Sequence, residues 1–221
     1  MKWKKIWRFI WNDDSWLSWA VNVVIAIIAV KFIIFPVLGL ALGTGFPVVA
    51  VVSCSMQHEP GNCWADCYMK SSGSFNDFKF CYSKQELLCG KESNGSYWNT
   101  CGEWYDKNGI NENQFLQFSQ NNGFNIGDIF VLRKAQNIEI GDVIVYDNGI
   151  SNAPIIHRVV KIIEENGKIY YQTKGDYNPV SYGFEEKIPE EKVFGKALLK
   201  IPYLGWVKIG FNMILKLMGL I

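Results

Sequence analysis

Two serines separated by one residue stand where an apolar, strand-like run ends. The run Pro47–Val52 leads into the motif Ser53-Cys54-Ser55-Met56. A serine hydroxyl is a weak nucleophile near neutral pH and becomes effective when a base within hydrogen-bond reach accepts its proton. The chain offers two histidines, and His157 is better placed than His58 because it lies inside a second strand-like run. This combination indicates the nucleophilic chemistry of a serine hydrolase.

Two further groups complete such a site. A carboxylate on the far nitrogen of the histidine ring fixes the tautomer and stabilises the imidazolium. Asp176, just beyond a strand-like run at 168–174, is the leading candidate. Alternation along a strand puts Ser53 on the same face as Ser55, so its hydroxyl can join the Ser55 backbone N–H in binding an oxyanion. Each residue also has a structural interpretation, since serines form turns and a histidine among β-branched residues is commonly a buried core residue.

The stretch ahead of the serines is apolar over the length of a membrane span. Between Trp16 and Val52 the one charged residue is Lys31. About 20 apolar residues cross the hydrocarbon core of a bilayer. Residues 16–42 therefore predict a transmembrane anchor rather than a cleaved signal peptide, whose apolar region is shorter.

The short segment before the anchor fixes the expected orientation. Its basic residues are Lys2, Lys4, Lys5 and Arg8. Positive charge on this side predicts a cytoplasmic N-terminus, with residues from about 43 onward on the outer face of the cell membrane. Tryptophans recur every four residues at Trp3, Trp7 and Trp11, so the tail is expected to be an amphipathic helix lying on the inner leaflet.

Short strand-like runs separated by turn signals predict an all-β domain. A Gly-Asp turn precedes β-branched and aromatic residues at both 126–132 and 140–146. Asn166-Gly167 lies between two further runs and predicts a tight hairpin turn. The expected strands are 47–56, 126–132, 140–146, 154–163, 168–174 and 192–200.

The chain divides into parts of different composition. They are a tail (1–15), an anchor (16–42), a β-rich catalytic domain (43–56 and 126–203), a cysteine-rich insertion (57–125) and an apolar C-terminal helix (204–221). In the last segment Lys208, Asn212 and Lys216 share one helix face. This stripe favours an interfacial helix, and a second membrane span is the alternative.

Cysteines are concentrated in the insertion. The six are Cys54, Cys63, Cys67, Cys81, Cys89 and Cys101. On the outer face of a membrane disulfides are permitted, and the spacing does not match a zinc finger. We expect two disulfides among the five cysteines of the insertion, with the fifth either free or paired with Cys54. We expect no metal and no cofactor. The net charge of +1 predicts no attraction to nucleic acid.

Several short motifs together resemble the type I signal peptidases of peptidase family S26, in their archaeal and endoplasmic-reticulum branch. The motifs are Pro47–Met56, Gly141–Tyr146, Ile155–Val160, Thr173–Asp176 and Ile201–Gly205. The resemblance implies a mainly antiparallel β domain resting on the outer face of the membrane, which removes signal peptides after small residues in an Ala-x-Ala-like pattern. By position it implies that Ser55 is the nucleophile, His157 the general base and Ser53 the oxyanion donor. Asp176 matches the aspartate of the Gly-Asp motif.

The chain departs from this family pattern in three places. Cys54 replaces the usual glycine between the serines, and the proline expected two residues after Met56 is absent. His58 occupies the position of that proline and is an alternative base. The family has a further aspartate about six residues beyond the Gly-Asp motif, but this chain has no acid between Asp176 and Glu185. The alternatives are that Asp176 serves alone, that the site is a Ser–His dyad, or that the enzyme is weakened.

The sequence therefore predicts a membrane-bound serine endopeptidase that removes signal peptides from secretory preproteins. The alternative is a catalytically weak or inactive binding module whose insertion recognises a partner. The peptide is expected to bind as an extended strand beside a sheet edge. Four apolar residues are expected to wall its side-chain pockets: Val143, Val145, Ile155 and Ile156. The expected partners are signal peptides and the lipid bilayer, and the sequence leaves open whether there are partner subunits.

Overall fold

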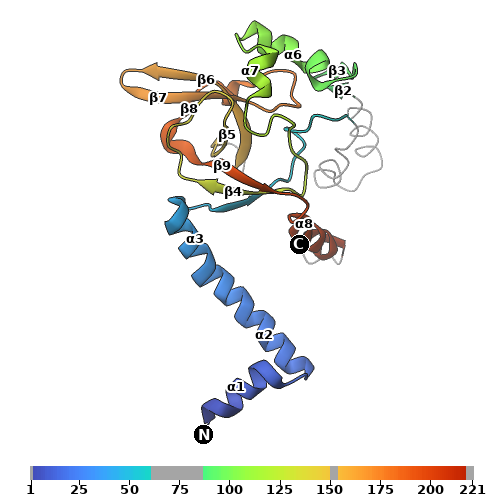
Figure 1. Cartoon of the computed structure of the whole chain (residues 1–221), viewed down its shortest axis with the longest axis vertical. Coiled ribbons are helices and arrows are strands. Elements are labelled where there is room, and N and C mark those ends of the chain that lie inside the picture. Colours follow the sequence, from blue (N-terminus) through green and yellow to red (C-terminus); the bar gives the residue numbers. More distant parts are fainter. Residues whose placement is uncertain (1, 61–86, 150–153, 218–221) are drawn as a thin grey trace.

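The structure is a computed structural model, and it describes residues 2–60, 87–149 and 154–217. A curved antiparallel sheet forms the main domain, and a long helix leads into it from the N-terminus (Figure 1). A shorter helix, α8 (Trp206–Leu217), follows the last strand. The predicted fold class is therefore confirmed.

Seven strands make the main sheet, in the order β1-β4-β9-β5-β6-β7-β8. Their bounds are β1 Val48–Ala50, β4 Ile129–Arg133, β5 Val143–Tyr146, β6 Ile155–Glu165, β7 Lys168–Lys174, β8 Ile188–Pro189 and β9 Val193–Ile201. All their pairings are antiparallel. The β6–β7 turn has positive φ at Asn166 and Gly167, as the predicted hairpin requires.

Alternating side chains of the central strands fill a separate core on each face of the sheet. Val143 and Val145 of β5 pack with Met56 and Phe130 on one face. Ile144 and Tyr146 pack on the other face, in a cluster with Val159, Tyr171 and Ile188. Strand parity therefore decides on which side of the sheet each polar residue of β6 and β7 lies.

The helix before the domain runs continuously from Trp16 to Leu42. It comprises α2 (Trp16–Ala29), a π-helical turn η1 (Val30–Ile34) and α3 (Phe35–Leu42). The wide turn ends just before Pro36, which has no N–H to donate. Apolar side chains along it, such as Ile27 and Leu40, are exposed. By length and composition this 27-residue helix suffices to cross a membrane.

The first helix, α1 (Lys2–Asn12), is amphipathic, as predicted for the tail. It folds back on α2 through hydrogen bonds from Ser18 Oγ to the Phe9 carbonyl (2.5 Å) and from Asn22 Nδ2 to the Ile10 carbonyl (2.8 Å). Its exposed tryptophans are Trp3, Trp7 and Trp11.

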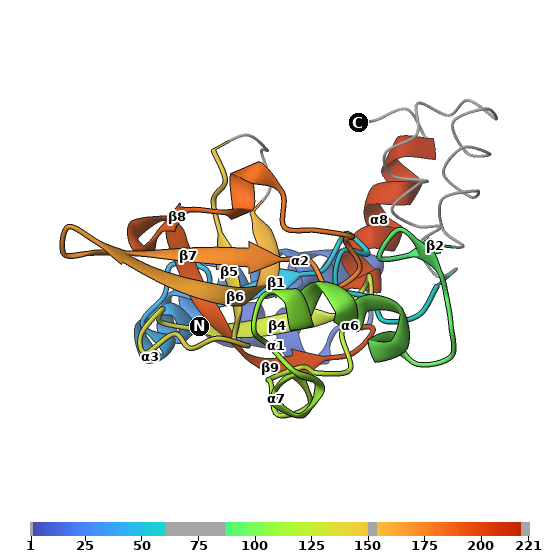
Figure 2. The same cartoon turned by 90° about the horizontal axis from the view of Figure 1, so that it is seen from above.

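The described part of the insertion lies at the end of the domain remote from the anchor (Figures 1 and 2). It contains the hairpin β2 (Leu87–Leu88) and β3 (Lys91–Glu92), then α6 (Tyr97–Lys107) and α7 (Glu112–Leu116). Tyr105 and Phe115 of these helices pack with Val160 of β6. The insertion thus shares a hydrophobic core with the sheet.

The C-terminal helix is attached beside the serine motif. Trp206 and Ile209 of α8 pack against Cys54 and Ile126. Gly127 has φ +89°, and a Cβ there would stand 2.2 Å from the Trp206 indole nitrogen. A glycine is therefore required where α8 meets the domain.

Candidate active site

The serine motif follows β1, and backbone contacts fix it. The Tyr177 N–H donates to the Ser55 carbonyl (2.8 Å), and the Phe124 N–H donates to the Met56 carbonyl (3.0 Å). Ser53 and Ser55 are half-buried, with their Oγ atoms 3.1 Å apart. The two hydroxyls therefore lie side by side. The strand predicted at 47–56 is, however, wrong beyond Ala50, because β1 ends there and the serine motif itself is a turn.

His157 projects from β6 and is 5% exposed. Its Nδ1 lies 2.5 Å from Oε1 of Glu185, which is fully buried. A hydrogen bond from Nδ1–H to a carboxylate leaves Nε2 as the nitrogen able to accept a proton. Glu185 therefore stands where the acid of a Ser–His–acid triad is needed.

Neighbouring donors hold the Glu185 carboxylate in place. The Tyr182 N–H donates to Oε2 (3.0 Å), and the Thr173 hydroxyl donates to Oε1 (3.3 Å). Thr173 in turn is 2.9 Å from the Tyr146 hydroxyl. Glu185 ends the short 3₁₀ turn η2 (Gly183–Glu185), which presents its side chain to the sheet.

Gly175 lies against both the His157 ring and the backbone of Ser55. A Cβ at this position would stand 2.9 Å from His157 Nε2 and 2.7 Å from the Ser55 carbonyl oxygen. Both groups therefore border the same small space, which a side chain would fill. Among the described side chains, Ser55 Oγ is hydrogen-bonded to Ser53 Oγ and not to His157.

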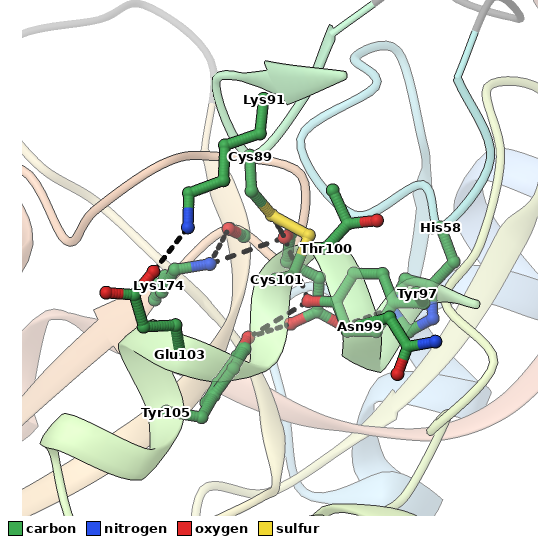
Figure 3. Close-up of a disulfide and its surroundings, with 12 residues drawn as sticks. His58, Cys89, Lys91, Tyr97, Asn99, Thr100, Cys101, Glu103, Tyr105 and Lys174 are labelled. Atoms are coloured by element: carbon green, nitrogen blue, oxygen red, sulfur yellow. Dashed lines mark hydrogen bonds and ion pairs between the residues drawn. A yellow bond between two sulfur atoms is a disulfide. The ribbon is translucent and has the colours of Figure 1, made fainter. Parts of the chain in front are cut away.

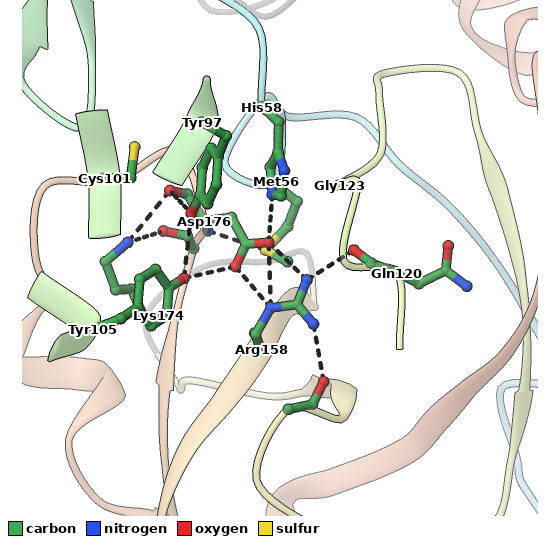
Figure 4. A network of polar contacts seen from close by, with 12 residues as sticks. Met56, His58, Tyr97, Cys101, Tyr105, Gln120, Gly123, Arg158, Lys174 and Asp176 are labelled. Carbon is green, nitrogen blue, oxygen red and sulfur yellow. Dashed lines mark hydrogen bonds and ion pairs between the residues drawn. The ribbon is translucent and has the colours of Figure 1, made fainter. Parts of the chain in front are cut away.

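Asp176 does not contact His157, and the expected Asp176–His157 contact is wrong. Figure 4 shows its carboxylate surrounded by Arg158, His58 and Tyr105. Oδ2 accepts from Arg158 Nη2 (2.7 Å) and His58 Nε2 (2.8 Å), while Oδ1 accepts from the Tyr105 hydroxyl (2.9 Å) and Arg158 Nε (3.0 Å). Burial raises the pKa of this carboxyl, but Arg158 and His58 outweigh it and hold the pKa well below its usual range.

Strand alternation explains this difference. His157 and Arg158 are consecutive on β6, so they point to opposite faces of the sheet. His157 faces Glu185, and Arg158 faces the insertion. Because Asp176 pairs with Arg158, it is on the wrong side to orient His157.

His58 is also engaged by Asp176, and its ring stacks on Tyr97 with the ring centroids 3.6 Å apart. Nε2 of His58 therefore points at a carboxylate and not at the serine motif. The alternative assignment of His58 as the base has no geometric support.

The four predicted wall residues differ in accessibility. Val143 and Val145 are fully buried in the core that contains Met56, so they offer a peptide no surface in this structure. Ile155 and Ile156 are half-buried on opposite faces. Of the four residues, Ile155 and Ile156 remain candidates for lining a substrate pocket.

The predictions about disulfides are confirmed in part. Cys89 and Cys101 form a disulfide that joins the β2–β3 turn to α6 (Figure 3). Cys54 is also disulfide-bonded. The remaining three, Cys63, Cys67 and Cys81, lie outside the described residues, so the second predicted disulfide of the insertion is untested. Within the described ranges no group of three or more His, Cys, Asp or Glu residues is placed to hold a metal ion.

An antiparallel β domain behind an apolar helix, with a serine at a strand end facing a strand histidine, is the arrangement expected of a type I signal peptidase. Sequence comparisons confirm this resemblance. The chain is 34% identical to the signal peptidase complex catalytic subunit SEC11 of Scheffersomyces stipitis over 101 residues, which are 42% of this chain and 61% of that protein. It is 35% identical to the subunit SEC11C of Homo sapiens over 105 residues, 44% of this chain and 55% of that protein.

A third relative, SEC11 of Candida tropicalis, is 32% identical over 101 residues, 42% of this chain and 61% of that protein. No protein-family model matches the chain. Each of the three sequence matches spans less than two thirds of the relative's own length. The chain is related to the catalytic subunits of the endoplasmic-reticulum type of signal peptidase over that shared part.

Proposed function

We propose that the protein is a membrane-anchored serine endopeptidase that removes signal peptides from exported preproteins. One observation carries the proposal: His157 has Nδ1 bound to the buried Glu185 and Nε2 beside Gly175, where the Ser55 backbone also lies. Homology to signal peptidase catalytic subunits supplies the substrate class.

In the proposed mechanism, Ser55 Oγ attacks the scissile carbonyl while His157 Nε2 accepts the hydroxyl proton. Glu185 stabilises the imidazolium that forms. The Ser53 hydroxyl and the Ser55 backbone N–H donate to the oxyanion of the tetrahedral intermediate. His157 then protonates the leaving amine, which departs as the new N-terminus of the mature protein.

Hydrolysis of the acyl-enzyme repeats these roles. A water molecule gives a proton to His157 Nε2 and attacks the ester carbonyl. The second tetrahedral intermediate collapses, the signal peptide leaves as a carboxylic acid, and the proton returns to Ser55 Oγ. No group other than the protein and water takes part in these steps.

The sheet provides a place for an extended substrate. β1 is the terminal strand of the sheet order and leads directly into the serine motif. A peptide adding to a strand edge gains main-chain hydrogen bonds and presents alternate side chains to the domain. Such a strand beside β1 would bring a peptide carbonyl toward Ser55. Of the two candidate wall residues, Ile156 packs against the core that contains Met56, whereas Ile155 lies on the opposite face of the sheet.

The helix Trp16–Leu42 is the proposed membrane anchor. With the basic tail in the cytoplasm, the catalytic domain lies on the side to which preproteins are exported. Enzyme and membrane-bound substrate then share one surface.

A cleavage assay tests the proposal. The full chain in detergent is mixed with a preprotein that carries an Ala-x-Ala site, and the new N-terminus is identified. Wild type is expected to cleave, and Ser55→Ala and His157→Ala are expected to lose at least about 10³-fold in kcat. Ser93→Ala, an exposed serine remote from the motif in sequence, is the matched control. Unchanged cleavage by Ser55→Ala would refute the mechanism.

The rival function, a catalytically silent binding module, depends on a missing triad acid. Glu185 supplies a carboxylate on His157, so that argument no longer favours the rival.

A further inference from the structure

The insertion, which the family resemblance does not cover, contacts the loop that follows β7. Tyr97 and Tyr105 of α6 donate hydrogen bonds to the carbonyl and to Oδ1 of Asp176, both at 2.9 Å. His58, at the start of the insertion, donates to Oδ2 at 2.8 Å. Three side chains of the insertion therefore bind one residue of the catalytic domain (Figure 4).

Arg158 completes the surroundings of Asp176 and ties a further part of the insertion to it. Its guanidinium is fully buried and donates to Asp176, to the carbonyls of Ser119 (2.6 Å) and Gln120 (2.9 Å), and to that of Gly141 (2.9 Å). A buried charge pair satisfied by so many hydrogen bonds has one preferred geometry. The position of Asp176 is therefore fixed from several directions.

The backbone around Asp176 in turn contacts the catalytic groups. The Tyr177 N–H donates to the Ser55 carbonyl at 2.8 Å, and the Asp176 N–H donates to Met56 Sδ at 3.3 Å. Gly175 lies against His157 Nε2. Residues 175–177 therefore contact both the serine motif and the side chains of α6.

The Cys89–Cys101 disulfide, which Figure 3 shows, contacts the same loop through Cys89. The Cys89 N–H donates to the Tyr177 carbonyl at 3.1 Å, and Cys89 Sγ is 3.2 Å from the Asp176 carbonyl oxygen. Cys101 belongs to α6, the helix that carries Tyr97 and Tyr105. The disulfide thus keeps α6 at the loop that it contacts.

We propose that the insertion is a positioning element of the active site, in which Tyr97, Tyr105 and His58 fix Asp176 so that residues 175–177 hold Ser55 beside His157. The disulfide Cys89–Cys101 maintains this arrangement. The inference rests on the proposed function, because the effect of positioning Ser55 is measured as the rate of peptide cleavage. Asp176, Tyr97, Tyr105 and His58 are positioning residues and do not touch the substrate.

The double variant Tyr97→Phe, Tyr105→Phe tests the proposal, because it removes two hydroxyls and keeps both rings. We expect kcat to fall about tenfold or more, since a misplacement of about 1 Å can cost a hundredfold. KM should change less than about twofold, as the peptide site along β1 is untouched. Tyr171→Phe is the matched control, because its hydroxyl contacts Glu190, away from Asp176. A purely structural role would lower the melting temperature and leave kcat unchanged below it, which would overturn the proposal.

Two substitutions of His58 distinguish a positioning role from a direct role in proton transfer. His58→Gln keeps an N–H donor near the position of Nε2, and His58→Ala removes it. We expect kcat close to wild type in His58→Gln and a fall of about tenfold in His58→Ala. Equal loss in both variants would mean that the imidazole itself is needed, and would contradict the assignment of His58.

Hydrogen exchange of the Tyr177 amide gives a readout that does not depend on activity. In the double tyrosine variant and in Cys89→Ser, Cys101→Ser, this amide is expected to exchange at least about tenfold faster than in wild type. If wild type fails to cleave but the Tyr177 amide exchanges faster in the variants, the proposed function is wrong. The contact between the insertion and residues 175–177 then still stands. If wild type cleaves and both kcat and exchange are unchanged in the variants, the inference is wrong and the proposed function stands.

Discussion

Glu185 is the residue whose role differs most from the expectation. It is fully buried and accepts three hydrogen bonds, one of them from His157 Nδ1. Asp176, the carboxylate that matches the family motif, instead forms an ion pair with Arg158. In the proposed site the two acids thus have two tasks: Glu185 orients His157, and Asp176 holds the loop beside it.

Glu185→Gln is expected to lower kcat by about 10²–10⁴, because it keeps the shape of the side chain but no longer stabilises the imidazolium. Steady-state cleavage of an Ala-x-Ala peptide measures the effect. The neighbouring Glu186 is exposed, and Glu186→Gln is the matched control with wild-type kcat. A wild-type rate in Glu185→Gln would show that His157 works without this carboxylate.

Lys174 gives a second prediction at the scale of a residue. Burial lowers the pKa of its ammonium to about 8, although Asp176 and Glu185 oppose the shift. In the unfolded chain the pKa is about 10.4, so between pH 8 and 10 the unfolded state binds more protons and stability rises with pH. Relative to Lys174→Met, wild type should gain up to about 3 kcal/mol across this window. Thermal unfolding of both proteins at pH 7.5 and 9.5 measures this, and a constant difference would contradict it.

At the scale of elements, the sequence was sufficient to predict those helices and strands that one regular pattern of residues determines. The apolar run at 16–42 predicted one long helix, and the structure has a helix at Trp16–Leu42. The run at 168–174 is β7, and Asn166-Gly167 is its hairpin turn. The strands expected at 126–132 and 140–146 begin about three residues later, because Asp128 and Asp142 accept backbone N–H bonds and extend the preceding turns.

The candidate site was predictable to a lesser degree. His157 lies in a strand as expected, whereas Ser55 lies in a turn beyond the end of β1, and both border Gly175. Glu185 comes from an irregular segment after β7 that ends in a 3₁₀ turn, and no periodicity in that segment indicates which side chain points inward. The orientation of Asp176 depends on the parity of β6, which a single sequence does not fix. A sequence signal did exist, since Glu185 is the first acid after Asp176.

At the scale of the whole molecule, the anchor and the catalytic domain are expected to act as one unit on a membrane. A span that confines enzyme and preprotein to a surface raises their effective concentration without any new contact. The cleavage rate should then follow surface density and not bulk concentration.

Reconstitution of the full chain with a membrane-embedded preprotein in liposomes tests this expectation. At fixed bulk concentrations, a tenfold increase in lipid should lower the initial rate of preprotein cleavage by about tenfold, because both partners are diluted on the surface. Cleavage of a soluble peptide with the same site is the control and should not change. Preprotein cleavage that is independent of lipid content would argue against confinement by the anchor.

The strand order of the sheet has a consequence for the time at which the protein can first act. β1, which precedes the serine motif, pairs with β4, and β4 pairs with β9, the last of the described strands along the chain. At 5–20 residues per second, synthesis from Ser55 to β9 takes on the order of ten seconds. During most of this interval the helix Trp16–Leu42 is already complete, while Ser55 has neither His157 nor Glu185. Under the proposed function, a newborn chain therefore inserts into the membrane before it is able to cut any peptide, its own included.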